Sequence, residues 1–402
     1  MDEKNFRVRD KALKIYSPSL LYGLGLGAVA PIIAIAARER GADIATAALI
    51  VTLIGVGSLI SNVPAALLIS RIGERFGMVI AAGWATAGMS VGLFDSSLVL
   101  FAVGVTMLGM AGSVFNLARQ SYLAEAIPQR YRARAMSTLG GVMRIGVFAG
   151  PFIATLAMKW WGIAGAYWVG TASMLVALVV CFAIPELPSR TLGNPESVAK
   201  SSTESMMSIA KENWRVLCGV GFGVFCIAAV RSTRQVVLPL WGDNLGLSIE
   251  TISLVYGLSG AIDMLIFYPA GKIMDIKGRA WIAVPCMVLM ALALGILPLT
   301  TGVGTFAAVA MLLGFGNGIG SGIVMTLGTD YSPVQGRAKF LGLWRLMADT
   351  GVMSGPILLA AMVAFASLSV GIWSIAAVSL LGAGIFGYFI PRSARNLIAE
   401  PK

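Results

Sequence analysis

Charged side chains interrupt several long apolar segments of this 402-residue sequence. Arg231 and Arg234 are three residues apart, so a helix places them on one face, and Asp263 lies in the middle of the next apolar segment. A charge at membrane depth costs on the order of a few kcal/mol, which makes such residues functional candidates. We interpret Asp263 as a protonation site that controls its hold on an arginine. A buried Arg–Asp pair that only stabilises the fold is the alternative interpretation.

Other charges fall near segment ends or near each other. Arg345 and Asp349 are four residues apart, a spacing at which two side chains on a helix can neutralise each other. Arg119 lies near the end of its segment, where its side chain can reach water, so we interpret it as a positioning or conformational-lock residue paired with Glu125. Glu125 and Asp330 each precede a proline by three residues, a position that also fits a structural role at a helix end.

Composition indicates the class of protein. Hydrophobic residues make up 57% of the chain and charged residues 12%, and the mean hydropathy is +0.83. A soluble domain needs more charge to cover its surface. The net charge of +11 comes mostly from lysines and arginines in short gaps between apolar segments rather than on one solvated face, which argues against nucleic acid as a partner.

Several kinds of chemistry are missing from the sequence. It contains no histidine, and its four cysteines lie within apolar segments without C-x-x-C spacing, so we expect no metal site and no cofactor. It has no phosphate-binding G-x-x-x-x-G-K-[ST] pattern, which excludes direct drive by ATP within this chain. No convergent set of catalytic residues is evident, so we do not expect an enzyme.

Apolar segments of about 20 residues, the length that crosses a bilayer, recur along the whole chain. They predict an all-α membrane protein with twelve transmembrane helices in two pseudo-symmetric bundles, residues 1–184 and 214–402, joined by a polar cytoplasmic linker at 185–213. The first six helices are expected at 17–37, 45–70, 77–94, 98–121, 135–158 and 162–184. The second six are expected at 214–240, 249–272, 280–299, 303–327, 338–364 and 368–390.

Lysines and arginines between the helices predict the orientation. If the N-terminus is inside, only Arg38, Arg40 and Lys159 fall on the outer side, and all the other loop and tail cations fall on the inner side. Both termini are therefore expected in the cytoplasm. This bias, the compact chain and its four cysteines suggest a bacterial inner membrane, and we expect a monomer there.

The two halves repeat at a constant offset of 205 residues, which relates Glu125 to Asp330 and Arg144 to Asp349. Halves with an even number of helices share one orientation and are related by an axis along the membrane normal, which places a central cavity at their interface. Glycines and prolines match at the same offset, in the pairs Gly73–Gly278, Gly146–Gly351, Gly150–Gly355 and Pro151–Pro356.

The loop after the second helix of each half carries a recognisable pattern. The second half has Gly271, Ile273, Asp275, Gly278 and Arg279, with Ile276 where arginine is usual. The first half has Leu68, Arg71, Gly73 and Arg75, and it departs from the pattern at Ala66, Ser70 and Glu74. These residues resemble the G-x-L-A-D-R-x-G-R-R signature of the major facilitator superfamily. The resemblance covers essentially the whole chain and is to bacterial twelve-helix efflux-type members.

The resemblance implies roles for several residues. The loop residues would form a cytoplasmic gate or lock, namely Arg71, Gly73, Asp275, Gly278 and Arg279; simple positive-inside anchoring is the alternative for the arginines of the first half. Gly146-x-x-x-Gly150-Pro151 resembles the family's antiporter motif, and Gly351, Gly355 and Pro356 repeat it, although plain helix packing explains both copies. Arg144 and Asp349 lie in helices that flank the cavity in this family, which makes them substrate or gating residues.

The resemblance further implies a secondary transporter that works by alternating access in the lipid bilayer. Without histidine, proton coupling would use carboxylates, first Asp263 and Asp349. Five arginines against two aspartates within the membrane favour anionic or zwitterionic small molecules. We therefore expect proton-linked efflux of small amphipathic or anionic organic compounds. Proton-linked uptake of an organic acid is the alternative within the family, and a polytopic membrane enzyme or a receptor is the alternative outside it.

Overall fold

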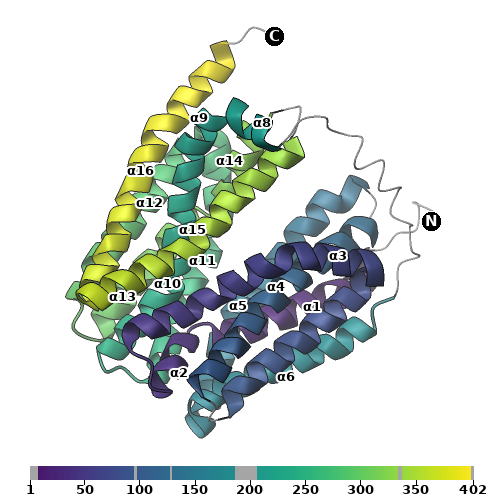
Figure 1. Cartoon of the computed structure of the whole chain (residues 1–402), viewed down its shortest axis with the longest axis vertical. Helices are drawn as coiled ribbons and strands as arrows, with labels where there is room; N and C mark the ends of the chain where they lie inside the picture. The colour runs from purple at the N-terminus through teal and green to yellow at the C-terminus, as the bar shows by residue number, and fades with distance from the viewer. Residues whose placement is uncertain (1–7, 95–96, 127–128, 186–205, 334–336, 400–402) are drawn as a thin grey trace. The chain divides into compact units, whose positions relative to one another are not determined.

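The computed structural model describes residues 8–94, 97–126, 129–185, 206–333 and 337–399 (Figure 1). The described residues are almost entirely helical and include no β-strand. The chain divides into two compact units, Met1–Leu192 with Ser248–Gly257 and Gly193–Leu247 with Leu258–Lys402. Most of the expected linker, residues 186–205, lies outside the described residues, and the end of the linker forms helix α8 (Met206–Glu212).

The first unit contains helices α1 to α6. α1 (Val8–Val29) and α2 (Ile33–Glu39) meet at a bend of 42° and together make one span. α3 (Ile44–Ser90) holds two spans on either side of Gly73, and the turn η2 (Val91–Leu93) follows it. α4 (Leu98–Ala126), α5 (Gln129–Trp161) and α6 (Ile163–Phe182) complete this unit. Within it, α1 packs on α5 and α6, and α3 packs on α4 and α6.

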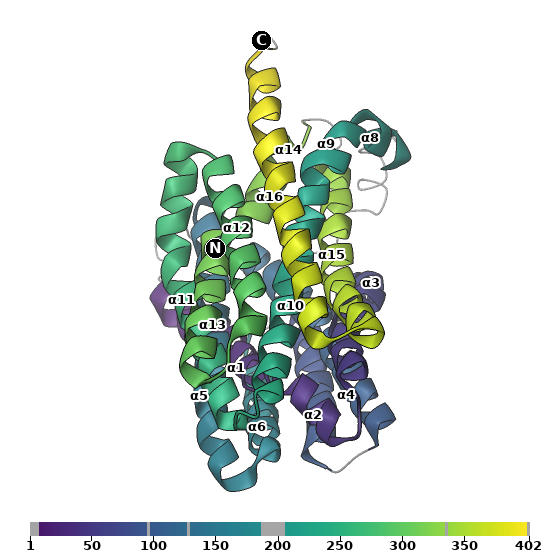
Figure 2. The ribbon, with the colours of Figure 1, turned by 90° about the vertical axis from the view of Figure 1, so that its left-hand side faces the viewer.

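The second unit continues from α8. It contains α9 (Trp214–Val216), the π-turn η3 (Leu217–Gly221), α10 (Phe222–Asn244), α11 (Ile249–Lys277), α12 (Ala280–Ile296), η4 (Leu297–Leu299), α13 (Val303–Ile319), α14 (Ile323–Tyr331), α15 (Arg337–Phe365) and α16 (Leu368–Ala399). The first turns of α11 are grouped with the first unit. α16 packs on both α10 and α12 and extends beyond them toward the C-terminus (Figure 2).

Within the described residues, eleven helices are long and apolar enough to cross a membrane, and the bent pair α1–α2 raises that number to twelve. The all-α, twelve-helix prediction is confirmed. One expected helix, 303–327, is interrupted: α13 ends at Ile319 and α14 begins at Ile323, because Gly322 has a left-handed φ of +89°. Apolar residues flank this glycine-rich break on both sides, which is why the sequence pattern predicts one continuous helix there.

Glycine contacts reproduce the internal repeat. A Cβ atom at Gly146 would overlap the carbonyl oxygen of Leu20 on α1, and a Cβ atom at Gly351 would overlap that of Phe225 on α10. Leu20 and Phe225 are themselves separated by the repeat offset. The next turn does the same, with Gly150 against Leu24 and Gly355 against Ala229. Since lipid tails are as apolar as the side chains, such close backbone contact is a main source of helix association in membranes.

Side-chain caps begin equivalent helices of the two halves. The N–H of Thr46 donates to a carboxylate oxygen of Asp43 (2.8 Å) at the start of α3, and the N–H of Thr251 donates to the Ser248 hydroxyl (3.3 Å) at the start of α11. Each cap satisfies one of the backbone donors that a helix start leaves free. The hydrogen bonds from Thr46 also lower the pKa of Asp43, which lies at the surface outside the span.

Candidate functional site

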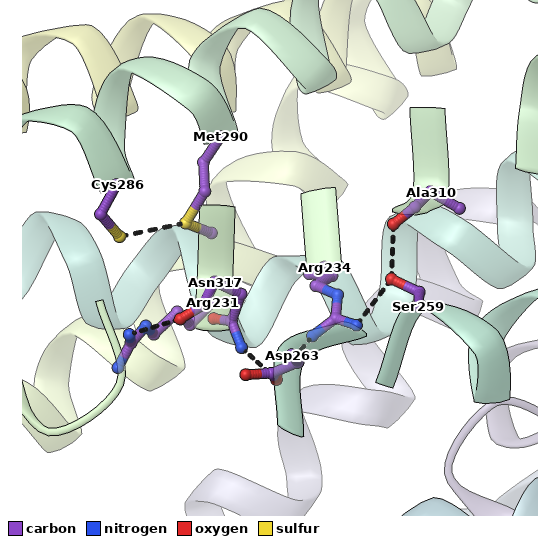
Figure 3. Close-up of polar contacts among 8 residues, drawn as sticks. All are labelled: Arg231, Arg234, Ser259, Asp263, Cys286, Met290, Ala310 and Asn317. Carbon is purple, nitrogen blue, oxygen red and sulfur yellow. Dashed lines mark hydrogen bonds and ion pairs between the residues drawn. The ribbon is translucent and has the colours of Figure 1, made fainter. Parts of the chain in front are cut away.

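Three helices of the second unit bring together a polar cluster, which we call the Asp263 network. Arg231 and Arg234 come from α10, Ser259 and Asp263 from α11, and Asn317 from α13 (Figure 3). The two arginines lie on one face of α10 because they are three residues apart. The close approach of α13 to α11 depends on glycine: a Cβ atom at Gly318 would lie 2.6 Å from the carbonyl oxygen of Asp263.

The carboxylate of Asp263 accepts two hydrogen bonds at the same oxygen, Oδ2. Asn317 Nδ2 donates at 2.5 Å, and Arg234 Nη1 donates at 3.4 Å. The Arg234 side chain is 10% exposed and the Asp263 side chain 24%. The ion pair is therefore partly removed from solvent, and its guanidinium–carboxylate distance is longer than that of a close charged hydrogen bond. This leaves the carboxylate reachable and its arginine only loosely held.

The second arm of Arg234 is anchored more tightly. Its Nη2 atom donates to the hydroxyl of Ser259 at 2.8 Å, and that hydroxyl donates to the carbonyl oxygen of Ala310 at 2.5 Å. Ser259 is completely buried. The serine thus orients the guanidinium from the side opposite the carboxylate, so Arg234 stays in place when its contact with Asp263 changes.

Arg231 contacts the broken helix rather than an acid. Its Nη2 atom donates to the carbonyl oxygen of Asn317 at 3.1 Å. In a continuous helix that carbonyl would accept from the N–H of Ser321, but this N–H bonds to Gly318 instead (3.1 Å). Arg231 therefore satisfies a carbonyl that the break at Gly322 leaves free. Such satisfaction is required because lipid offers no hydrogen bonds.

The Asp263 network carries more positive than negative charge. It contains two arginines and one aspartate, and two of its buried polar atoms, Arg231 Nε and Asn317 Oδ1, have no hydrogen-bond partner among the described residues. Cys286 lies against the same break, since a Cβ atom at Gly320 would meet both its sulfur and Arg231. A site of this kind can bind an anionic group and can exchange a proton at its carboxylate.

Three other predicted binding or coupling residues lie outside this cluster. Arg345 Nε and Asp349 Oδ2 are 3.8 Å apart on α15, and the arginine side chain is 71% exposed. Arg144 is exposed on α5 of the first unit. The structure thus places Arg345 and Asp349 as a pair one turn apart on α15, with the aspartate half-buried.

The loop residues of the two halves share backbone geometry. Gly73 and Gly278 both have a left-handed φ, +82° and +95°. In the second half, Arg279 Nε donates to Asp330 Oδ2 at 2.8 Å and so links the start of α12 to the end of α14. In the first half the equivalent of Arg279 is Glu74, which accepts a hydrogen bond from Ser121 on α4 (2.9 Å).

The remaining loop and lock residues are placed less completely. Arg71 is exposed. The side chains of Asp275 and Glu125 lie outside the described residues, and so does the expected pairing of Glu125 with Arg119. Arg119 itself is half-buried on α4.

Ser259 and Asn317 were missed by the sequence analysis. Both are uncharged, so a search for ionisable residues in apolar segments passes over them. Asn317 does carry one signal, as a lone amide within the glycine-rich stretch 314–322 of a membrane span. Amides at membrane depth usually form hydrogen bonds between helices, which would have directed attention to it.

Known proteins resemble the chain along its length. Residues 18–223 and 220–401 match the Major Facilitator Superfamily. An uncharacterized MFS-type transporter of Methanocaldococcus jannaschii is 21% identical, over 83% of this chain and 86% of that protein. A multi-drug resistance efflux pump PmrA homolog of Lactococcus lactis is 24% identical (61% and 60% covered), and a Na⁺, Li⁺, K⁺/H⁺ antiporter of Planococcus maritimus is 23% identical (63% and 65% covered).

Solved structures show the same fold. A POT family transporter in complex with a thioalcohol-conjugated peptide has a TM-score of 0.77 and 11% identity, with 96% of each chain covered. A bacterial homolog of the human lysosomal transporter Spinster has a TM-score of 0.73 and 13% identity, covering 94% of this chain and 96% of that one. With twelve helices in a repeated arrangement and a family match over both halves, the chain is a multi-pass membrane transporter and belongs to the Major Facilitator Superfamily.

Proposed function

We propose that this protein is a proton-coupled transporter of small compounds that carry an anionic group, with Asp263 as the proton site and Arg234 as the anion site. The Asp263 network supports this proposal, because a substrate anion and the Asp263 carboxylate would compete for one guanidinium. Ser259 holds that guanidinium at 2.8 Å from the other side, so it remains in place for either partner.

In this network, protonation and anion binding would favour each other. A proton on Asp263 removes the negative charge that attracts Arg234 and so increases the positive charge of the network. Conversely, an anion at Arg234 displaces the carboxylate and makes it easier to protonate. By thermodynamic linkage, protonation of Asp263 raises the affinity for the anion by the same factor as the bound anion raises the affinity for the proton. For an anionic substrate, the network therefore favours movement of proton and substrate in one direction, which is uptake under an inward proton gradient.

Efflux of amphipathic compounds in exchange for protons is the second candidate. Two relatives support it, since one is named as a multi-drug resistance efflux pump homolog and the other as a Na⁺, Li⁺, K⁺/H⁺ antiporter. In that mechanism a cationic group would take the place of the proton at Asp263, so the substrate and the proton would exclude each other. The two candidates thus differ in the charge of the substrate and in the sign of coupling.

We also propose the arrangement in the membrane. Residues 1–184 and 214–402 would act as the two six-helix halves, with residues 185–213 as a cytoplasmic linker. The loop cations support an orientation with both termini in the cytoplasm, and a bacterial inner membrane is the proposed location. We propose that a monomer carries out the cycle.

The experiment uses purified protein in liposomes that contain a pH-sensitive dye. Benzenesulfonate, a fixed anion, or benzyltrimethylammonium, a fixed cation, is added outside while the lumen pH is recorded. Neither probe can carry a proton by itself. Acidification of the lumen by the sulfonate indicates co-transport, and alkalinisation of an acidic lumen by the ammonium ion indicates exchange.

The Asp263→Asn variant should abolish proton movement with either probe, while exchange of the labelled sulfonate, which binds at Arg234, continues across the membrane. Asp330→Asn is the matched control, because it removes an aspartate from another Arg–Asp pair of the same unit and should leave the ratio of protons to substrate unchanged. Proton movement that persists in Asp263→Asn would contradict the proposal for both directions. Absence of proton movement with both probes in the parent protein would contradict it as well.

A further inference from the structure

The first unit contains a half-buried arginine outside the Asp263 network. Arg119 lies on α4 within the span Leu98–Leu123. Its Nε and Nη1 atoms are removed from solvent and have no hydrogen-bond partner, and it forms no ion pair with any described side chain. A buried charge without partners costs several kcal/mol, and unsatisfied groups of this kind often mark a missing ion or ligand.

Two buried hydroxyls lie on the part of α1 that runs past Arg119, since Tyr16 packs on the cluster of Leu123 and Tyr22 stacks on Phe115. Tyr22 is fully buried and stacks on Phe115, with ring centroids 4.0 Å apart and planes inclined by 8°. Phe115 is one turn before Arg119 on α4, and long side chains on a helix lean toward its N-terminus, so Arg119 extends toward the stacked rings. The Tyr22 hydroxyl lies 3.7 Å from the position of a Cβ atom at Gly112, on the face of α4 that also carries Arg119. Ser19 is one turn from Tyr22 on the same side of α1 and is 1% exposed.

None of these hydroxyls has a partner among the described residues. The Tyr22 and Ser19 oxygens are both buried without a hydrogen bond. In the described part of the chain, other buried atoms of the first unit also lack a hydrogen-bond partner, namely Arg38 Nε, Arg40 Nε, Arg75 Nε, Tyr167 Oη and Thr171 Oγ1. Arg119 differs from those three arginines in having two such atoms, Nε and Nη1, on one guanidinium.

We propose that Arg119, Tyr22 and Ser19 form a binding site for an oxyanion group, that is, a carboxylate, sulfonate or phosphate. The three residues supply a cation and two hydroxyl donors, and they include no acidic acceptor. The planar guanidinium matches two oxygens of such a group at once. The repeat supports a role beyond scaffolding, because the equivalent of Arg119 in the second half is the apolar Val324. The site depends neither on proton coupling nor on the direction of transport.

The test measures thermal unfolding of the full-length protein, followed by the fluorescence of its nine tryptophans. The probe is sodium benzenesulfonate in neutral detergent, compared with sodium chloride at equal ionic strength. We expect the sulfonate to raise the unfolding temperature of the parent by about 1–3 °C at concentrations several times its dissociation constant. Because the probe can also bind at Arg234, the variants are compared in the Arg234→Leu background, where Arg119→Gln should remove the remaining rise. The matched control Arg71→Gln, an exposed arginine of the same unit, should retain it.

A measurement without the probe separates binding from a structural role. Arg119→Gln should unfold at the same temperature as the parent or higher, because it removes a buried charge that has no partner. In Tyr22→Phe, about five times more sulfonate should be needed for the same rise in unfolding temperature, as expected for loss of one hydrogen bond. This variant keeps the ring that stacks on Phe115, so it provides the answer if Arg119→Gln fails to fold.

The source of the oxyanion is distinguished in lipid nanodiscs. If the occupant is a free anion, the sulfonate effect appears in phosphatidylcholine discs and depends on Arg119. If it is a lipid headgroup, phosphatidylglycerol alone produces an Arg119-dependent rise and sulfonate adds nothing. Either result supports the site. A sulfonate effect that survives in both Arg119→Gln and Tyr22→Phe, or no Arg119-dependent effect of either probe, would overturn the proposal.

Discussion

The two halves of the chain share a scaffold but differ in their polar groups. A Cβ atom at Gly109 would overlap the carbonyl oxygen of Ile54, and one at Gly314 would overlap that of Ser259, two contacts related by the repeat offset. The side chains around these contacts are different. Arg234, Asp263 and Asn317 of the second half correspond to Val29, Ser58 and Gly112 of the first. The repeat thus preserves positions where helices touch, while the groups available for binding occur where the halves differ.

The largest difference between the halves should appear at Asp263. Asp263→Ala leaves two arginines without a carboxylate and should lower the free energy of unfolding by about 3 kcal/mol. The equivalent Ser58→Ala should change it by less than about 0.5 kcal/mol. Adding Arg234→Leu to Asp263→Ala should recover at least half of the loss. Reversible unfolding in mixed micelles measures all three values, and equal costs at Asp263 and Ser58 would refute the contrast.

The shared scaffold should respond equally in both halves. Gly150→Ala and Gly355→Ala each force a methyl group into a backbone carbonyl and should each cost about 1–3 kcal/mol in the same unfolding assay. Gly141→Ala on α5 is the control, because no atom lies within 4 Å of its added methyl group. It should be neutral or slightly stabilising, as alanine favours a helix. A large cost in only one half would show that the repeated contact is not equivalent.

The loop glycines provide a second test of equivalence. Gly73→Ala and Gly278→Ala place a side chain at a φ of +82° or +95°, which should cost about 1–2 kcal/mol each. Gly271→Ala, near the end of α11 before the second of these loops, has open space around it and should have a smaller effect. Thermal unfolding of the three variants side by side is sufficient. A neutral effect at Gly73 alone would indicate that only the second half needs this turn.

The smallest expected difference concerns the helix caps. Hydrogen bonding lowers the pKa of Asp43, so its carboxylate stabilises the folded protein above its ordinary pKa, and this contribution disappears as the pH falls through the lowered value. Asp43→Ala should therefore cost more stability at pH 7 than at pH 3. Ser248→Ala at the equivalent cap should cost the same at both pH values, because serine does not titrate. If Asp43→Ala lowered the stability equally at both pH values, Asp43 would not act as a charged cap of α3.

Much of this fold could be predicted from the sequence because the bilayer imposes strong rules. Apolar length located the helices, and repeated glycines located the contacts of α5 and α15. The proximity of Arg234 and Asp263 followed from equal depth on successive helices. The acceptor of Arg231 could not be predicted, because it is a backbone carbonyl that becomes free only when Gly322 adopts a left-handed conformation. Side-chain patterns contain no information about such a group.

That same bond limits how the second unit can move. The Arg231 guanidinium of α10 donates to the Asn317 carbonyl oxygen of α13. If one helix slid past the other, that carbonyl would lose its donor in lipid, which offers no replacement. Either water must reach Asn317 during the transport cycle, or α10 and the interrupted helix must travel as one rigid body. At the break near Gly322, α10 and α13 are therefore held together by a hydrogen bond, and the break does not act as a hinge between these two helices.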